Sequence, residues 1–276
     1  MQISAAIIDT YPDKKFASLA IKMVQRIPFV VNIITFTDTP FSEIENVKFI
    51  HTPPLKSNNE YGQVIFEKLP EIITDERVLI FQWDGFPLNP NKWKDEFLNY
   101  DYIGAPLGNW MGNGGFSLRS KKLLHKLRDL NISVDLTNPY DQPEDLIICT
   151  HKRSLLEMNG IRFAPLDIAS QFSFEWGLKN KNVFGFHAPF NLPIFFNESD
   201  LIRYADNIIP RISQPTSMVP YLNSCLEQKM YELLHITLSN YQNKPNLLKA
   251  FQYLSATNPN NPLLKFFVDS PAQNKV

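Results

Sequence analysis

The apolar positions of residues 1–85 alternate between short continuous runs and helical spacings. Strands are predicted at the continuous runs, which are Ser4–Ile8, Val30–Phe36, Val47–Ile50 and Val78–Gln82. Apolar residues recur every three or four positions over residues 12–27 and over Tyr61–Ile73, which predicts two helices. This alternation of strands and helices indicates an α/β fold of the Rossmann type, with a mixed, mostly parallel sheet flanked by helices.

The alternation becomes looser after Asp84, and the last part of the chain reads as helical. Further elements are predicted as strands at Phe116–Leu118 and Asn182–Pro189 and as helices at Lys121–Leu130 and Pro143–Lys152. Apolar residues at helical spacing then predict one helix over Tyr221–Tyr241 and a second helix after Pro245. We therefore expect a main domain over residues 1–200 and a small α-helical C-terminal extension over residues 201–276.

Composition narrows the class of protein without naming a function. Hydrophobic residues make up 44 % of the 276 residues and charged residues 20 %, which is typical of a globular chain. The formal net charge of −1 gives no general attraction to nucleic acid. The two cysteines, Cys149 and Cys225, lie far apart, so no disulfide framework or Cys-x-x-Cys site is predicted, and we expect a reducing, cytoplasmic setting.

Membrane insertion is not expected, because no apolar segment reaches 18 residues and the N-terminus lacks a basic region before its apolar run. Peripheral contact with the inner face of a membrane stays open.

Polar residues follow three of the predicted strands. Because ligands of open α/β sheets bind beyond the carboxyl ends of the strands, we expect these residues around one cleft. They are Asp9 and Thr10, Thr37 and Asp38, and Trp83 and Asp84. Asp84 could supply an oxygen ligand to Mg²⁺ or Mn²⁺. The alternative is that Asp84 and Gly85 only form a turn.

Glycine is concentrated in one segment. Five of the ten glycines lie between Gly104 and Gly115, where the backbone must turn tightly or approach a ligand closely. The backbone and the amide of Asn113, Gly114 and Gly115 could line a polar ligand such as a sugar. A plain β-bulge or hairpin loop is the alternative. The spacing does not match a phosphate-binding P-loop.

Two later positions could carry chemistry. Glu144 and Asp145 stand at a predicted helix start, where one carboxylate could accept a proton from an attacking hydroxyl. Acidic residues are common in the first turn of a helix because they interact with the helix dipole, so a structural role competes. His187 lies in an apolar segment, and a functional role is expected for it only if the fold brings it close to Asp84.

Together these segments resemble a nucleotide-sugar glycosyltransferase of the GT-A type, and most specifically the glycosyltransferase-like family called domain of unknown function 5672. The likeness covers roughly residues 1–190. It is carried by the segments 79–84, 102–106, 112–119, 143–145 and 184–187, of which Asn113–Arg119 is the most specific.

The resemblance implies an inverting transfer from a nucleoside diphosphate sugar, with a UDP-sugar expected. In such enzymes an Asp-x-Asp motif holds a divalent metal, and here that motif reads Gln82, Trp83, Asp84. The resemblance makes Asp84 and His187 the ligands of Mn²⁺ or Mg²⁺. It makes Asp145 the catalytic base and Glu144 the alternate.

The donor site implied by the resemblance comprises Asp9, Thr10, Thr37, Asp38, Tyr61, Gln82, Trp83, Asn113, Gly114 and Gly115. Tyr61 is expected to stack on the nucleoside, although packing against the sheet competes.

A glycan or lipid-linked glycan is the expected acceptor, in glycan biosynthesis. Four alternatives stay open. The first is a degenerate sugar-nucleotide or glycan-binding module of the same fold, suggested by Gln82. The second, a nucleotidyltransferase, is disfavoured because Asp9–Lys15 contains no Gly. The third is an interaction protein that works through its helical tail, which could also form oligomers. The last is that the apolar stripes of the tail simply pack on the main domain.

Overall fold

A computed structural model describes residues 2–41, 44–108, 110–138, 140–176, 180–241 and 245–268. Its contacts divide the chain into two compact units, residues 1–187 and 188–276. The boundary expected near residue 200 falls inside helix α9 (Glu198–Arg203), and the division into two domains stays a prediction.

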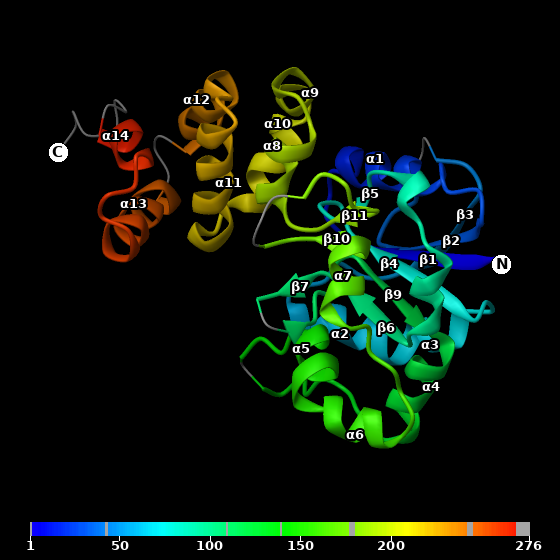
Figure 1. The fold of residues 1–276 in the computed structure, drawn as a ribbon. Coiled ribbons are helices and arrows are strands. Elements are labelled where there is room, and N and C mark those ends of the chain that lie inside the picture. Colours follow the sequence, from blue (N-terminus) through cyan, green and yellow to red (C-terminus); the bar gives the residue numbers. More distant parts are fainter. Residues whose placement is uncertain are drawn as a thin grey trace. The chain divides into compact units, whose positions relative to one another are not determined.

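The first unit is built on a six-stranded sheet (Figure 1). In spatial order its strands are β3 (Val47–His51), β2 (Val30–Thr37), β1 (Ile3–Ile8), β4 (Arg77–Phe81), β9 (Ser117–Ser120) and β6 (Tyr102–Gly104). Strands β3, β2, β1 and β4 are parallel, whereas β9 runs antiparallel to both of its neighbours. The predicted mixed, mostly parallel α/β sheet is confirmed.

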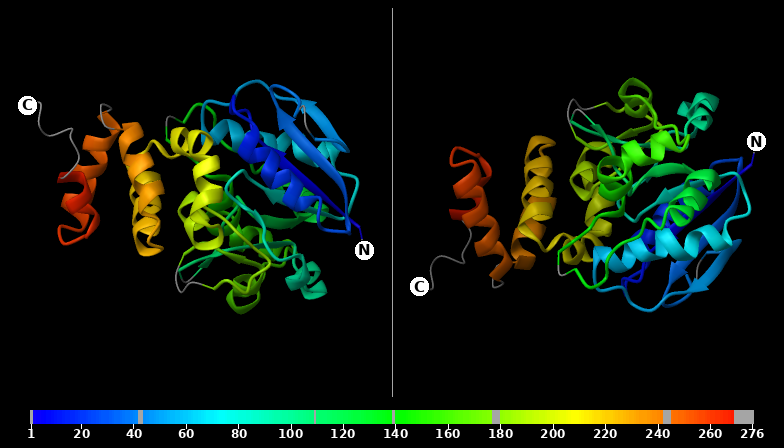
Figure 2. Two further views of the ribbon diagram at one scale, coloured as in Figure 1. Left: turned by 90° about the horizontal axis from the view of Figure 1, so that it is seen from above. Right: turned by 90° about the horizontal axis from the view of Figure 1, so that it is seen from below.

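Helices cover both faces of this sheet (Figure 2). Helix α1 (Lys15–Val24) lies on one face and buries Phe16, Ala20 and Val24. The opposite face carries the helical segment 58–72 together with α4 (Lys121–Asp129). Strands β1 and β4 are buried along nearly their whole length because both faces are covered, which is why they appear in the sequence as continuous apolar runs.

The helix predicted over Tyr61–Ile73 begins earlier and changes its winding. It starts at α2 (Asn58–Gln63), where the Ser57 hydroxyl accepts a hydrogen bond from the Glu60 N–H, as expected of a helix cap. A π-helical turn (Val64–Lys68) follows and then α3 (Leu69–Ile72). A second π-helical turn (Ile147–His151) follows the short helix α5 (Glu144–Leu146). Such turns contain one extra residue and often occur beside functional sites.

A small second sheet brings distant segments together. Its strands are β10 (Ser173–Phe174), β11 (Gly185–Phe186) and β5 (Phe86–Pro87). Only Gly185–Phe186 of the predicted strand Asn182–Pro189 is extended in a sheet. Aromatic rings pack around the second sheet, among them Phe86 against Phe186, with ring centroids 4.9 Å apart.

The remaining elements of the first unit connect these layers. They are the 3₁₀ turns Pro90–Lys92 and Asp95–Asn99, the two-stranded sheet β7 (Pro106–Leu107) with β8 (Trp110–Met111), α6 (Arg153–Met158) and α7 (Leu166–Phe172).

The second unit is helical. Its α-helices are α8 (Leu192–Phe195), α9, α10 (Ala205–Ile208), α11 (Pro215–Glu227), α12 (Tyr231–Tyr241), α13 (Pro245–Thr257) and α14 (Leu263–Val268), with 3₁₀ turns at Pro189–Asn191 and Ile209–Ile212. Helix α11 packs on α12 and α13. The prediction of one helix over Tyr221–Tyr241 is wrong, because Lys229 adopts a left-handed conformation (φ 59°) that ends α11 and allows α12 to start in a new direction.

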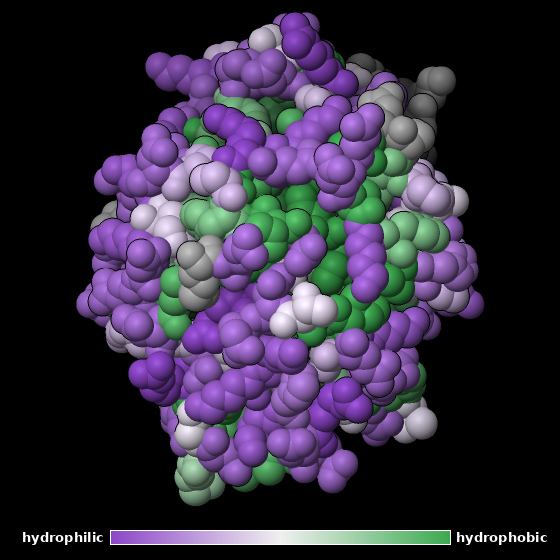
Figure 3. Space-filling view, turned by 90° about the vertical axis from the view of Figure 1, so that its right-hand side faces the viewer, coloured by the Kyte–Doolittle hydropathy of each residue, from purple (hydrophilic) through white to green (hydrophobic). Residues whose placement is uncertain are grey.

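No helix among the described residues is both long and apolar enough to cross a membrane. Apolar side chains nevertheless reach the surface on the side of the first unit that carries β2 and β3 (Figure 3), where Val31 and Phe49 are 43 % and 39 % exposed. A cavity of about 550 Å³ lies nearby, lined by residues of α1, the start of β2 and the segment 44–46. It is at the amino end of β2, away from the carboxyl edge where the strand-end residues lie.

We expect Lys229→Gly to stabilise the junction of α11 and α12 by about 1 kcal/mol, because glycine adopts the left-handed conformation without the steric cost that a side chain adds. Amide hydrogen exchange of both helices in the full chain measures this. Lys229→Ala keeps a Cβ and serves as the control that gains nothing. Equal exchange rates in all three proteins would show that the left-handed residue costs nothing at this junction.

Candidate functional site

The site lies where the order of the main sheet reverses. The chain adds β2 and β3 on one side of β1 and then returns to add β4 on the other side. The carboxyl ends of β1 and β4 therefore lie side by side and open a crevice for ligands. Asp9 follows β1, and Gln82 to Asp84 follow β4, as the sequence predicted.

The second sheet adds His187 and Glu175 to this edge. Because β11 pairs with both β10 and β5, Glu175 and His187 follow neighbouring strands and lie close to Asp84. Nε2 of His187 is 3.8 Å from Oδ1 of Asp84, and its Nδ1 is 3.5 Å from Oε1 of Glu175. The expected meeting of Asp84 and His187 therefore occurs, and a second carboxylate joins them.

Two glycines make room for the imidazole ring of His187. A Cβ on Gly85 would lie 2.6 Å from Cδ2 of the ring, and a Cβ on Gly115 would overlap the ring at Nε2. The ring is also 3.0 Å from Oε1 of Gln82 at Nε2 and 2.9 Å from Nδ2 of Asn113 at Nδ1. The glycines are thus explained by close approach of backbone to a side chain of the protein itself.

The charge of His187 depends on these neighbours. Burial by itself lowers the pKa of an imidazole, but the carboxylates of Asp84 and Glu175 outweigh burial and raise the pKa of His187 to about 9. The Asn113 amide can donate to Nδ1 only while that nitrogen is unprotonated. The charged ring instead donates toward Glu175, so protonation changes the partner of Nδ1.

These groups are not arranged as a metal centre. Oxygen and imidazole donors suit Mg²⁺ or Mn²⁺ in chemical kind. Within the described ranges, however, no set of three or more His, Cys, Asp and Glu side chains is placed to hold a metal ion. Nε2 of His187 already contacts Oε1 of Gln82 at 3.0 Å. The residues as they lie therefore do not fit the predicted cation.

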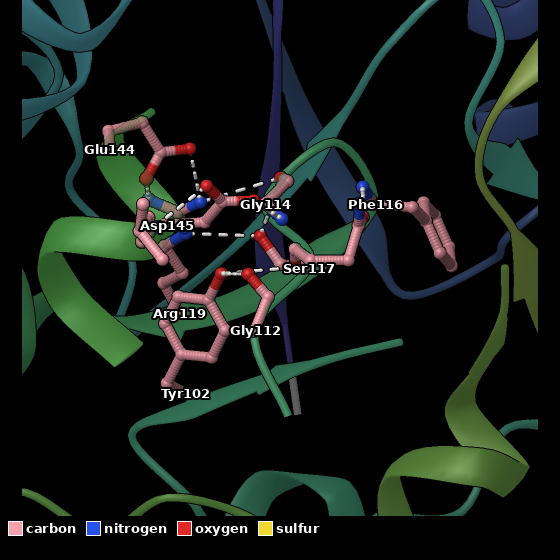
Figure 4. Close-up of polar contacts among 10 residues, drawn as sticks. Tyr102, Gly112, Gly114, Phe116, Ser117, Arg119, Glu144 and Asp145 are labelled. Atoms are coloured by element: carbon pink, nitrogen blue, oxygen red, sulfur yellow. Dashed lines mark hydrogen bonds and ion pairs between the residues drawn. The ribbon is translucent and has the colours of Figure 1, made fainter. Parts of the chain in front are cut away.

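The acidic pair lies beside the glycine-rich loop and the end of β9 (Figure 4). Arg119, in β9, donates from Nη1 and Nη2 to the two carboxylate oxygens of Glu144, each at 2.8 Å. The backbone N–H of Gly114 donates to Oδ2 of Asp145 at 2.8 Å. A Cβ on Gly114 would overlap Oε1 of Glu144, so only glycine lets the loop pass between the two acids.

The two acids differ in their surroundings. Glu144 forms a buried ion pair with Arg119, whose side chain is completely inaccessible to solvent. Asp145 accepts hydrogen bonds only from backbone N–H groups, those of Gly114 and Leu146, among the described residues. Burial and the adjacent charge of Glu144 raise the pKa of Asp145 to about 6. A carboxylate with such a pKa is suited to accept a proton near neutral pH.

Lys14 links the carboxyl ends of β1 and β2 by hydrogen bonds. Nζ of Lys14 donates to Oδ1 of Asp38 and to the backbone oxygen of Asp9, both at 2.8 Å. Burial opposes the ionised form of Asp38, but the hydrogen bond and charge of Lys14 lower its pKa overall. Lys14 thus holds Asp9 and Asp38 together on this edge, where the strand order places both.

Several predicted donor-site residues have contacts within the protein. The Thr10 hydroxyl accepts a hydrogen bond from the N–H of Leu55, and that of Thr37 donates to the backbone oxygen of Thr39.

The aromatic donor-site residues also have protein neighbours. Trp83 packs edge-on against Phe16 at a centroid distance of 5.9 Å. Tyr61 lies near the acidic pair, where burial and then the charge of Glu144 raise the pKa of its hydroxyl. Their roles toward a nucleotide stay predictions.

Three residues of the site were not identified from the sequence. Arg119 closes the glycine-rich string, but nothing in its spacing indicates that it is fully buried against Glu144. Glu175 stands alone between aromatic residues and becomes recognisable only through the pairing of β10 with β11. Lys14 could have been found, because it follows the end of β1 by a few residues in a segment that also carries Asp9.

The segment that contains Asp84, Gly114, Asp145 and His187 belongs to a known family. Residues 43–187, just over half of the chain, match the family described as protein of unknown function DUF5672. The chain therefore belongs to this family, as its motifs suggested. No curated protein matches the chain.

Solved structures of glycosyltransferases show a distant likeness. The apo form of glycosyltransferase GlyE of Streptococcus pneumoniae TIGR4 is 14 % identical with a TM-score of 0.44, over 68 % of this chain and 54 % of that chain. The chain thus spans about half the length of GlyE. The mannosyltransferase PcManGT of Pyrobaculum calidifontis, in complex with GDP-Man and Mn²⁺, is 11 % identical with a TM-score of 0.44, over 99 % and 82 %.

A glycosyltransferase involved in the glycosylation of the major capsid of PBCV-1 is 16 % identical with a TM-score of 0.42, over 68 % of this chain and 92 % of that chain. All three TM-scores lie below 0.5, so these matches do not determine what this chain does.

We expect Gly115→Ala to destabilise the first unit by about 1–3 kcal/mol, because the new methyl group displaces the buried imidazole of His187. A double-mutant cycle with His187→Ala measures the coupling. In the His187→Ala background most of the cost should disappear. If Gly115→Ala destabilises the His187→Ala variant by as much as it destabilises the wild type, the new methyl group clashes with a residue other than His187.

We expect Asp145→Asn to gain stability relative to the wild type between pH 4 and pH 7, by at most about 3 kcal/mol. The folded state raises the pKa of Asp145 from about 4 to about 6, so the folded wild type binds more protons than the unfolded state and loses stability as the pH rises through that window. The Asn amide can accept only one of the two backbone hydrogen bonds, which lowers the stability of the variant equally at both pH values. Urea unfolding of both proteins near pH 7 and near pH 4 measures the difference. A difference in stability that does not change with pH would contradict the raised pKa.

Proposed function

We propose that the chain is a glycosyltransferase that transfers a sugar from a nucleoside diphosphate sugar to a hydroxyl group of a glycan or glycoconjugate. The observation that supports this most is the state of Asp145. It is a largely buried carboxylate with a pKa raised to about 6, beside a glycine-rich loop at the carboxyl edge of the sheet. A base with these properties suits deprotonation of an acceptor hydroxyl.

The proposed step inverts the configuration at the anomeric carbon. The acceptor oxygen forms a bond to that carbon while the bond from the carbon to the diphosphate oxygen breaks, and its electron pair leaves with the diphosphate. The hydroxyl proton passes to Asp145 and later to water. Because the described side chains do not form a cation site as they lie, no step of this proposal is assigned to Mn²⁺ or Mg²⁺.

The finer parts of the proposal rest on the strand-end residues and on the motifs. The nucleoside would lie at the edge organised by Lys14, near Asp9 and Asp38, with a UDP-sugar as the expected donor. The sugar would lie against the loop of Asn113, Gly114 and Gly115. A glycan or lipid-linked glycan acceptor, a cytoplasmic setting and association through the C-terminal helices belong to the same proposal.

A second candidate is a sugar-nucleotide or glycan-binding module without catalysis. One observation favours it over an enzyme. Gln82 stands at the position of the first acid of the Asp-x-Asp motif, and its Oε1 contacts His187 rather than an open site.

We expect the purified chain to be stabilised by one family of nucleoside diphosphate sugars in a thermal-shift screen of UDP, GDP, CMP and TDP sugars, each with Mn²⁺ and with EDTA. A ligand at a hundredfold excess over its Kd adds about 2.7 kcal/mol of stability. For the donor so identified, Asp145→Asn should lower kcat by about 10²–10⁴-fold and leave donor binding intact.

Donor binding without transfer to any acceptor would favour the binding module. Binding of no nucleotide sugar would contradict the glycosyltransferase and leave a module that binds glycans.

A further inference from the structure

Arg119 and Glu144 form a closed unit that leaves no group of either side chain for catalysis. Both oxygens of Glu144 accept from the guanidinium at 2.8 Å. The remaining Arg119 contacts go to the Ser117 hydroxyl at 3.0 Å, from Nε, and to the backbone oxygen of Gly114 at 3.4 Å. The side chains are 0 % and 5 % exposed.

A carboxylate held in this way has no free oxygen for a substrate proton, because both of its oxygens already accept hydrogen bonds from Arg119. Loss of either charge would leave the other charge buried without its partner, and burying an unpaired charge is costly. Burial alone would lower the pKa of the Arg119 guanidinium, but Glu144 outweighs burial and raises that pKa. The ring of Tyr102 lies 4.9 Å from the guanidinium. Arg119 therefore stays charged and keeps both oxygens of Glu144 occupied.

The same pair positions Asp145. The backbone of Gly114 has Arg119 on one side, through its carbonyl, and Asp145 on the other, through its N–H. A Cβ on Gly114 would be 2.9 Å from both Nη2 of Arg119 and Cβ of Asp145. Movement of the Arg119–Glu144 pair would therefore be transmitted through Gly114 to the Asp145 carboxylate.

Asp145 has several charged and titratable neighbours. They are Glu144 beside it on α5, Arg119 on β9, Tyr61 on α2, Tyr102 on β6, Cys149 in the π-helical turn and His187 after β11. Glu144 exerts a larger effect on the ionisation of Asp145 than Arg119 does, and the two act in opposite directions.

We propose that Arg119 is a positioning residue that locks Glu144 out of catalysis, so that Asp145 alone is the base and the fixed charge of Glu144 sets the pH range in which it works. This inference rests on the proposed function. It decides between the two acids of the pair, which the sequence leaves open. Glu144 then acts through its charge and through the position of Asp145, without contacting the substrate.

The test compares pH–rate profiles of transfer for the wild type, Glu144→Gln and Asp145→Asn. We expect the acid limb to lie near pH 6 in the wild type and to move to lower pH in Glu144→Gln, while burial, the larger cause, still holds it above the ordinary range of a carboxylate. Its plateau kcat should fall by about tenfold, because a less basic carboxylate is a weaker catalyst. Asp145→Asn should lose about 10²–10⁴-fold in kcat at every pH. Asp141→Asn, an exposed acid of the same segment, is the matched control and should leave the profile unchanged.

An acid limb that stays near pH 6 in Glu144→Gln would overturn the proposal, as would a loss of kcat in Glu144→Gln as large as that in Asp145→Asn. Because Glu144→Gln leaves Arg119 buried without a counter-charge, a second variant removes both charges. In Arg119→Gln/Glu144→Gln the acid limb should also move down, since the larger of the two opposing effects is lost. An unmoved limb in that folded variant overturns the proposal equally.

A substrate-free measurement separates this inference from the proposed function. The carboxyl carbon of Asp145, assigned by its loss in Asp145→Asn, is titrated by NMR in the free protein. A midpoint near pH 6 that falls in Glu144→Gln supports the electrostatic part, whether or not any nucleotide sugar binds. A wild-type midpoint near pH 4 overturns it. Failure of the ligand screen alone contradicts only the proposed function.

Discussion

The buried ion pair between Arg119 and Glu144 holds the candidate site together. It joins the central sheet, through β9, to the helix that begins at Glu144 and to the glycine-rich loop between them. Removing one partner of such a pair typically costs about 3–5 kcal/mol, because the other charge is left without solvent or partner. Two parallel hydrogen bonds also fix direction, which a single contact would not. Placement of Asp145 relative to the sheet follows from this fixed direction.

Two features of the fold bring the side chains of the site to one edge of the main sheet. One is general to α/β sheets, in which the reversal of strand order beside β1 places the residues after β1 and β4 at one edge. The other is particular to this chain, in which a three-stranded sheet of very short strands delivers Glu175 and His187 to the same edge. The aromatic packing around that sheet, including Phe86 and Phe186, supplies the apolar contact that such short strands need.

Much of the main sheet could be predicted, because strands buried on both faces appear as continuous apolar runs. The edge carrying Asp84 followed from strand order alone. Three features could not be predicted. The two-residue strands are too short to show a periodicity in the sequence. The contact of His187 with Glu175 depends on the long-range pairing of these strands, so the sequence does not predict it. The burial of Arg119 runs against the usual exposure of arginine. The apolar spacing continues through Lys229, so the break between α11 and α12 leaves no signal in the pattern.

The π-helical turn at Val64–Lys68 has a consequence for the tolerance of the chain to changes in length. An α-helix advances by 100° per residue, and the extra residue of a π turn offsets the two halves of the helix by that angle. The half before the turn carries Gly62, which is packed close to Glu144, and the half after it buries Leu69 in the core. Loss of a single residue within the turn would restore regular α-helical winding. One half of the helix would then rotate relative to the other, so Gly62 and Leu69 could not both keep their contacts. Homologous chains should therefore preserve the length of this segment more strictly than its composition.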